Sequence, residues 1–220
     1  MRRLLSVWAL LVLACQGSVP IDHEDPRARD PEEVDLGADP WRGRRRMDLD
    51  QLDASIRRVT GGIGWESWRR NGDTWEVSTR YFEQYADTLG VPDYINGTSE
   101  DRSVSLLFQK FLDDAARNVC RRLVDREGGR GQAYDGEPAG IFAPVDVNAA
   151  DTPPADADAA LSSLLLRFHG RRVEVGSDEL RPWHDLYVRL AATEAATETP
   201  RRAWEGVCVA LITHPDFYTY

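Results

Sequence analysis

The stretch from Asp101 to Arg126, DRSVSLLFQKFLDDAARNVCRRLVDR, decides the fold class. Its apolar residues recur every three or four positions and cover one face of a helical wheel: Val104, Leu107, Phe108, Phe111, Leu112, Ala115, Val119 and Leu123. Charged and amide side chains cover the other face: Lys110, Asp113, Asp114, Arg117, Asn118 and Arg121. An apolar stripe with a polar back is typical of a helix that packs on a core and has one wet side.

Helical spacing continues on both sides of this stretch. From Met47 onward, apolar residues recur at helical spacing and stop at Gly61-Gly62: Leu49, Leu52, Ile56 and Val59. A second helix is expected from near Trp75 to Leu89, with Asp73 and Glu76 at the spacing of a capping box. Further helices are expected over 159–169, over 182–195 and from Thr199 to just before Pro215. Only 171–175 looks like a strand, and it is too short to build a sheet.

These patterns predict an all-α fold: a single irregular helical domain of about six helices with long loops, over residues 47–220. Residues 127–154 interrupt the helical pattern with several glycines and the pair Pro153-Pro154. We expect one long surface loop there, and because long loops in compact domains often carry function, it is a candidate contact site.

Composition limits the class of protein. The chain has 220 residues, of which 42% are hydrophobic, which is enough for one sizeable core. Its net charge is −10. Since an acidic protein is repelled by the nucleic acid backbone, no nucleic acid partner is expected.

The N-terminus has the pattern of an export signal. Met1-Arg2-Arg3 is a short basic region, and Leu4 to Ala14 is apolar except for one serine. Eleven residues rise about 16 Å as a helix, roughly half of the hydrocarbon core, so the segment is too short to span a bilayer. It is therefore interpreted as the apolar part of a signal peptide.

The end of this segment, Val12-Leu13-Ala14-Cys15, resembles the lipobox of bacterial lipoproteins. The resemblance implies cleavage between Ala14 and Cys15, which removes residues 1–14, and attachment of diacylglycerol to the thiol of Cys15. Gln16 follows the cysteine, and in the lipoprotein sorting rule this favours the outer membrane. The expected location is the cell envelope, lipid-anchored, facing the periplasm or the cell exterior. The alternative is an ordinary secretory signal in which Cys15 is incidental.

Residues 15–46 are expected to form an acylated, disordered tether. The segment is rich in proline and acidic residues and has little apolar periodicity, so it cannot bury enough surface to offset its ordering entropy. It closes with a basic run: Arg42, Arg44, Arg45 and Arg46. This run is either a contact with anionic lipid head groups or a solvated boundary.

Cysteine and histidine provide the candidates for covalent and metal chemistry. In an exported chain the remaining pair, Cys120 and Cys208, can form one disulfide, or remain as two separate buried thiols. The four histidines stand singly in the sequence: His23, His169, His184 and His214. No zinc or haem spacing, phosphate loop or nucleophile motif occurs, so no metal, cofactor or catalytic residue is assigned.

Three of the seven tryptophans, Trp65, Trp68 and Trp75, occur close together. They can stack on sugar rings, anchor a protein partner, or fill the core between two helices. The first function hypothesis is therefore a non-enzymatic adaptor domain for another envelope protein. The alternatives are a glycan-binding module built on these tryptophans and a hydrolase with an unrecognised carboxylate site.

The closing segment, Ala203 to Phe217 (AWEGVCVALITHPDF), resembles the end of a helix in uncharacterised exported helical proteins of myxobacteria and planctomycetes. Leu89 to Tyr94 and Phe111 to Ala116 share this character. The resemblance implies a helical exported domain and does not indicate any particular activity.

Overall fold

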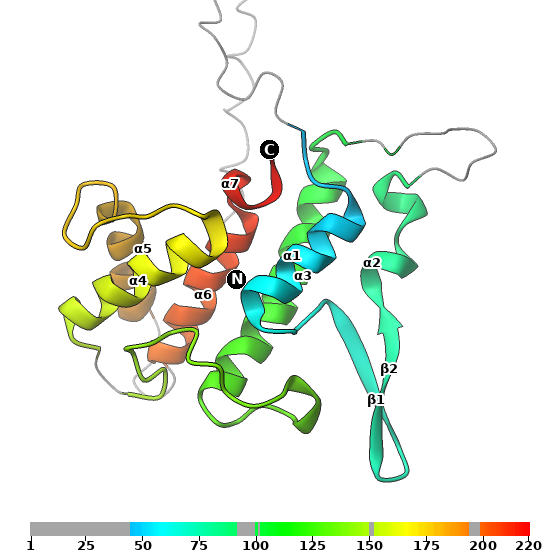
Figure 1. Ribbon diagram of the computed structural model, residues 1–220, viewed down its shortest axis with the longest axis horizontal. Helices are drawn as coiled ribbons and strands as arrows, with labels where there is room; N and C mark the ends of the chain where they lie inside the picture. Colours follow the sequence, from blue (N-terminus) through cyan, green and yellow to red (C-terminus); the bar gives the residue numbers. More distant parts are fainter. Residues whose placement is uncertain (1–44, 92–99, 101, 150–151, 194–198) are drawn as a thin grey trace, which may run out of the picture. The chain divides into compact units, whose positions relative to one another are not determined.

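The computed structural model describes residues 45–91, 100, 102–149, 152–193 and 199–220. All of them belong to one compact unit, Gly43–Tyr220. The expected signal peptide, Cys15 and the tether up to residue 44 lie outside the described residues. The unit is mostly helical, with one small sheet (Figure 1). In the described part of the chain, no helix is both long enough and apolar enough to cross a bilayer.

Helix α1 (Leu49–Thr60) confirms the first periodic stretch. Asp48 caps its N-terminus and forms a capping box with Gln51, so two backbone N–H groups of the first turn are satisfied. Gly61 ends the helix in the left-handed region at φ 69°, where glycine has no Cβ to clash. The expected apolar residues all lie in the core: Leu49, Leu52, Ile56 and Val59.

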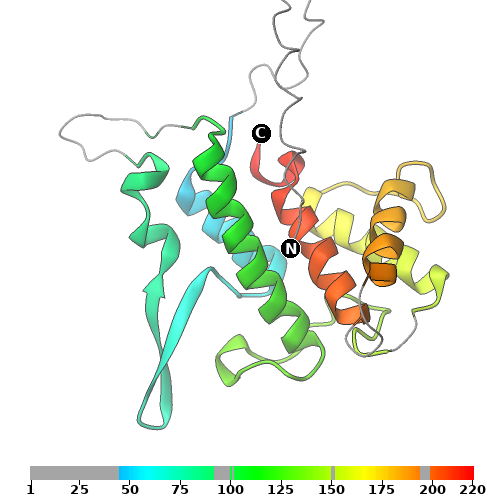
Figure 2. The same cartoon turned by 180° about the vertical axis from the view of Figure 1, so that it is seen from behind.

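Helices α3 (Leu106–Glu127) and α6 (Thr199–Thr213) pack against each other (Figure 2). Most of the expected apolar face of α3 is buried, and so are the α6 residues Trp204 and Val207. The structure joins the two helices by a disulfide between Cys120 and Cys208, whose Cα atoms lie 5.7 Å apart.

The N-terminal end of that apolar face departs from the expectation. Val104 and Leu107 are 45% and 47% exposed. Val104 precedes the helix, which begins at Leu106 after the cap Ser105, and Leu107 lies in its first turn. The expectation that these two residues face the core was wrong.

The C-terminal helices follow the expected pattern with shifted ends. Helix α4 (Pro154–His169) begins earlier than expected, with a proline in its first turn, and stops at Gly170. Helix α5 (Arg181–Thr193) and α6 follow, and α5 packs against α6. A short helix α7 (Pro215–Tyr218) was not expected. Residues 171–175 form no strand.

The sheet is an antiparallel hairpin of β1 (Glu66–Asn71) and β2 (Thr74–Arg80). The helix expected from Trp75 to Leu89 was wrong, and so was its capping box. The chain instead turns at Gly72, whose φ of 61° suits a tight hairpin loop. Only α2 (Tyr81–Gln84) and the 3₁₀-helix η1 (Asp87–Leu89) are helical in this region.

The long connection after α3 is part of the core as well as of the surface. It contains the 3₁₀-helix η2 (Ala133–Asp135). Ile141 and Phe142 are buried, and the Phe142 ring lies 5.7 Å from the Trp204 ring. The buried carboxylate of Glu127 accepts hydrogen bonds from the backbone N–H groups of Ala139 and Ile141. The connection is therefore anchored at its middle.

Arg46 belongs to the folded unit, which corrects the expected end of the tether. Its side chain is buried and donates to the Leu89 carbonyl and to Glu100 Oε1, each at 2.8 Å. Its backbone forms a β-bridge with Thr219, next to the C-terminus. Arg46 is therefore neither a lipid contact nor a solvated boundary residue.

Candidate functional site

The structure separates the three tryptophans that the sequence groups together. Trp65 is buried, 5.2 Å and 5.1 Å from the rings of Tyr81 and Phe82, so it fills the core. Trp68 and Trp75 lie on the hairpin, at diagonal positions of one face because Trp68 pairs with Val77. Trp65 is therefore not available to a surface ligand.

Tyr134 of η2 holds the two hairpin tryptophans. The Trp68 ring stacks on the Tyr134 ring at 4.9 Å with an interplanar angle of 11°, and Trp75 meets it edge-on at 4.9 Å. Arg122 of α3 lies over the Tyr134 ring at 5.4 Å. The aromatic faces are thus used for contacts within the protein and do not form an open sugar platform.

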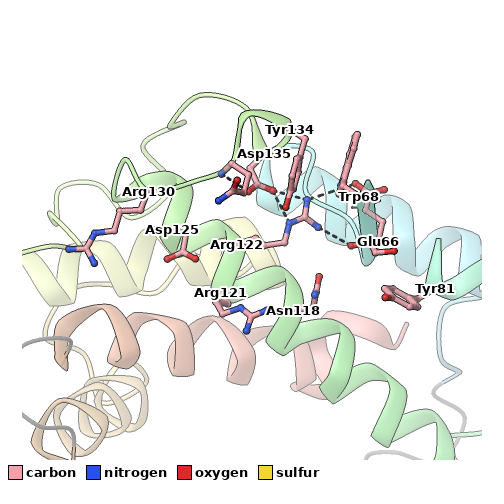
Figure 3. Close-up of a pocket in the computed structure, with 12 residues that line it drawn as sticks. Glu66, Trp68, Tyr81, Asn118, Arg121, Arg122, Asp125, Arg130, Tyr134 and Asp135 are labelled. Atoms are coloured by element: carbon pink, nitrogen blue, oxygen red, sulfur yellow. Dashed lines mark hydrogen bonds and ion pairs between the residues drawn. The ribbon is translucent and has the colours of Figure 1, made fainter. Parts of the chain in front are cut away.

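These contacts border a cavity of about 360 Å³ between the hairpin, α3 and η2 (Figure 3). Its lining comes from three separate segments of the chain. The lining residues are Glu66, Ser67, Trp68, Tyr81, Asn118, Arg121, Arg122, Asp125, Arg130, Gln132, Tyr134 and Asp135.

Arg122 lies in the middle of this cavity, between Asp135 and Glu66 (Figure 3). Its guanidinium donates to Asp135 Oδ1 at 2.8 Å and to the Gly64 carbonyl at 2.9 Å, and it lies 4.0 Å from Glu66 Oε1. Glu66 also pairs with Arg57 at 2.8 Å. Both buried carboxylates are thus held by arginines, and the network fixes the wall of the cavity. It does not present two carboxylates poised for proton transfer.

Two polar atoms of the lining residues lack a partner. The amide oxygen Oδ1 of Asn118 and the indole Nε1 of Trp68 are buried and form no hydrogen bond with the described residues. An unmade hydrogen bond of a buried group costs about 1–3 kcal/mol, so such groups are uncommon and need an explanation. Asn118 Oδ1 is an acceptor, whereas Trp68 Nε1 is a donor.

Arginines gather at the edge of the cavity. The side chains of Arg121 and Arg130 are exposed and form no hydrogen bond or ion pair with the described residues. A second cavity of about 220 Å³ shares Arg121, Asp125 and Arg130 and adds further residues from α6: Arg201, Arg202 and Glu205. In a chain of net charge −10, this cluster makes a local positive region.

Glu205 reports on the environment of the second cavity. Burial raises the pKa of the Glu205 carboxyl above its usual range, against the opposing effect of the nearby Arg202 and Arg121 guanidinium groups. The Asp125 carboxylate accepts a hydrogen bond from Arg201 and is therefore already paired within the protein. Of the arginines that line the two cavities, Arg121 and Arg130 are those that form no hydrogen bond or ion pair within the described part of the chain.

The four histidines stand singly in the sequence, but the structure gives three of them a nearby titratable partner. His184 pairs with Asp158 at 2.6 Å. His169 and His214, however, lie with their ring centroids 5.0 Å apart, in a cluster with Asp216. No local spacing could indicate this contact, because the two histidines come from the ends of different helices.

Comparisons of this chain with protein-family models, with curated proteins and with solved structures find no match. Its function is therefore inferred from the geometry of the site.

Proposed function

We propose that this chain is a lipid-anchored protein of the cell envelope whose helical domain binds an acidic sugar unit of an envelope glycan. The anchor is the acylated Cys15 that the lipobox pattern indicates. The ligand site is the cavity between the hairpin, α3 and η2.

The unpartnered atoms of Asn118 and Trp68 carry this proposal. A sugar hydroxyl both donates and accepts a hydrogen bond. Once these buried atoms turn toward the cavity that their residues line, neighbouring hydroxyls can donate to Asn118 Oδ1 and accept from Trp68 Nε1. A volume of about 360 Å³ lies within the range of small-molecule sites. A purely apolar ligand would leave both polar atoms without a partner.

The guanidinium groups of Arg121 and Arg130, which have no ion-pair partner in the described ranges, favour an anionic ligand. A planar guanidinium matches a carboxylate with two parallel hydrogen bonds. Both arginines lie beside a network in which Arg122 already uses its donors on Asp135 and Gly64. They can therefore bind a ligand carboxylate without breaking an internal ion pair.

The test compares a uronic acid trisaccharide with its neutral counterpart, using calorimetry and tryptophan fluorescence on the full chain. We expect the acidic sugar to bind at least tenfold more tightly, about 1.4 kcal/mol, and its binding to weaken with added salt. Arg121→Ala/Arg130→Ala should remove the preference, and Trp68→Phe should weaken binding of both sugars.

Arg69→Ala is the matched control. Arg69 is on the same hairpin but lies on its other face, 70% exposed, paired with Glu76 at 3.6 Å. Equal affinity for the two sugars, or an Arg69→Ala loss as large as that of the double variant, would count against the acidic sugar.

A second candidate function is an adaptor for another envelope protein. Val104, Leu106 and Leu107 are 45%, 90% and 47% exposed at the start of α3. Exposed apolar groups of this kind can anchor a protein partner. Mild crosslinking in the native host should recover a stoichiometric partner that Leu106→Asp loses, whereas an unchanged partner would show that another surface binds it.

The anchor has its own test. Cys15→Ala should move the protein from the membrane fraction to the soluble fraction and abolish its labelling by palmitate. Retention of both properties in the variant would refute acylation at Cys15.

A further inference from the structure

A cluster of three side chains lies away from the cavity described above, where the ends of α4 and α6 meet α7. His169 is the last residue of α4, His214 lies between α6 and α7, and Asp216 is in the first turn of α7. One ligand atom from each residue lies within 4.8 Å of the other two. The described residues contain no other group of this kind.

His169 has its tautomer fixed by the fold. Its Nε2 lies 2.9 Å from the Leu211 carbonyl oxygen, which can only accept, so Nε2 carries the proton. The lone pair is then on Nδ1, which is buried and has no hydrogen-bond partner among the described residues. A metal-binding histidine commonly donates its other N–H to a carbonyl in this way.

Burial favours the neutral form of this ring. Desolvation lowers the pKa of His169, and the hydrogen bond to Leu211 opposes this effect only in part. The neutral imidazole is the form that binds a metal ion.

His214 and Asp216 are held beside it. Asp216 Oδ2 lies 3.7 Å from His214 Nδ1 and 3.1 Å from a guanidinium nitrogen of Arg171. The Trp183 ring lies 5.6 Å from the His169 ring and 5.8 Å from the His214 ring, so it forms an apolar wall. Arg171 orients the carboxylate and the Trp183 ring packs beside both imidazoles, and such neighbours commonly hold the ligands of a metal site in place.

We propose that His169, His214 and Asp216 bind a divalent transition metal ion of the zinc class. Two imidazoles and one carboxylate are a common ligand set for such ions, whereas magnesium and calcium prefer oxygen ligands throughout. Around a tetrahedral zinc ion with bonds of about 2.1 Å, ligand atoms lie about 3.4 Å apart. The three atoms, which lie within 4.8 Å of one another, would draw closer together around the ion. The site is independent of the sugar cavity.

The experiment titrates Zn²⁺ and Co²⁺ into the full chain after treatment with a chelator. We expect one saturable equivalent per chain, and visible absorption bands of four- or five-coordinate Co²⁺ that Zn²⁺ removes. His214→Ala and Asp216→Asn should each weaken binding at least about tenfold, and His169→Gln should do the same.

His184→Ala is the matched control, because His184 also pairs with an aspartate, Asp158, and this pair lines another cavity. It should leave the affinity unchanged, as should His23→Ala in the N-terminal segment. Circular dichroism of each metal-free variant should match that of the wild type. Two results would overturn the proposal: no saturable equivalent, or a loss in His184→Ala equal to that in His214→Ala. A fold lost in His214→Ala leaves Asp216→Asn as the deciding variant.

Discussion

Arg126→Ala is expected to be among the most destabilising single changes in this domain. The Arg126 side chain is 2% exposed and donates to three carbonyl oxygens, those of Thr60 at 2.8 Å, Gly61 at 3.1 Å and Asp135 at 3.3 Å. It also pairs with Glu127, 5% exposed, at 2.9 Å. One guanidinium thus joins the end of α1, the end of α3 and η2.

The magnitude follows from what the substitution leaves behind. Removing one partner of a buried ion pair costs about 3–5 kcal/mol, because the other charge stays buried without compensation. The Glu127 carboxylate keeps its bonds from Ala139 and Ile141, which places the expected loss near the lower end, about 3 kcal/mol. Arg117→Ala is the control on the same helix: Arg117 is 66% exposed and pairs with Asp113, a contact worth about 0.5 kcal/mol.

The assay is urea unfolding followed by far-ultraviolet circular dichroism. With a slope of about 2 kcal/mol per molar urea, a loss of 3 kcal/mol lowers the midpoint by about 1.5 M. Arg117→Ala should lower it by about 0.25 M or less. If Arg126→Ala shifts the midpoint no further than Arg117→Ala does, the assigned role of the buried guanidinium is wrong.

Three further changes test other parts of the fold. Cys120→Ala/Cys208→Ala should lower the free energy of unfolding by about 4–5 kcal/mol, because the bridge closes a span of 88 residues, and reducing agent should destabilise only the wild type. Phe142→Ala should cost about 3–5 kcal/mol in calorimetric unfolding and expose the middle of its loop to protease; a loop as resistant as before would show that it is anchored elsewhere. Glu205→Gln should stabilise the protein at pH 7. The raised pKa means that ionising this carboxyl costs more free energy in the folded state than in the unfolded state. The gain should disappear as the pH falls below about 4.5, where the carboxyl is protonated in both states.

The long helices could be predicted because their apolar residues repeat over three or more turns. Leu52 and Ile56 of α1 and most of the predicted stripe of α3 are buried as expected. Gly61 ends α1 where the pattern stops. Helix ends were less certain, since Val104 fits the stripe by spacing but lies outside the helix.

The hairpin could not be separated from a helix by periodicity. Val77, Tyr81 and Tyr85 fit an interval of four, yet the residues from Trp75 to Thr79 also alternate. The deciding signal was the two-residue connection after Asn71, a glycine followed by an aspartate, which favours a tight turn between strands.

The candidate site could be predicted only in part. Composition makes Trp68 a candidate, but its partner Tyr134 belongs to the long loop, and helical spacing places Asn118 on the polar face of α3. The contact of Trp68 with Tyr134 is tertiary, because the two residues lie 66 positions apart in the sequence. The contact between His169 and His214 has the same origin, which is why single histidines in a sequence carry so little information.

The bridge between Arg46 and Thr219 has a mechanical consequence. A protein held through the chain before Arg45 receives any pulling force at that point. Because Arg46 is clamped by Leu89 and Glu100, the load passes into the core at once and reaches the C-terminal segment through the bridge. Helix α1 is thereby shielded from being peeled off turn by turn. A domain fastened in this way is expected to yield all at once under tension.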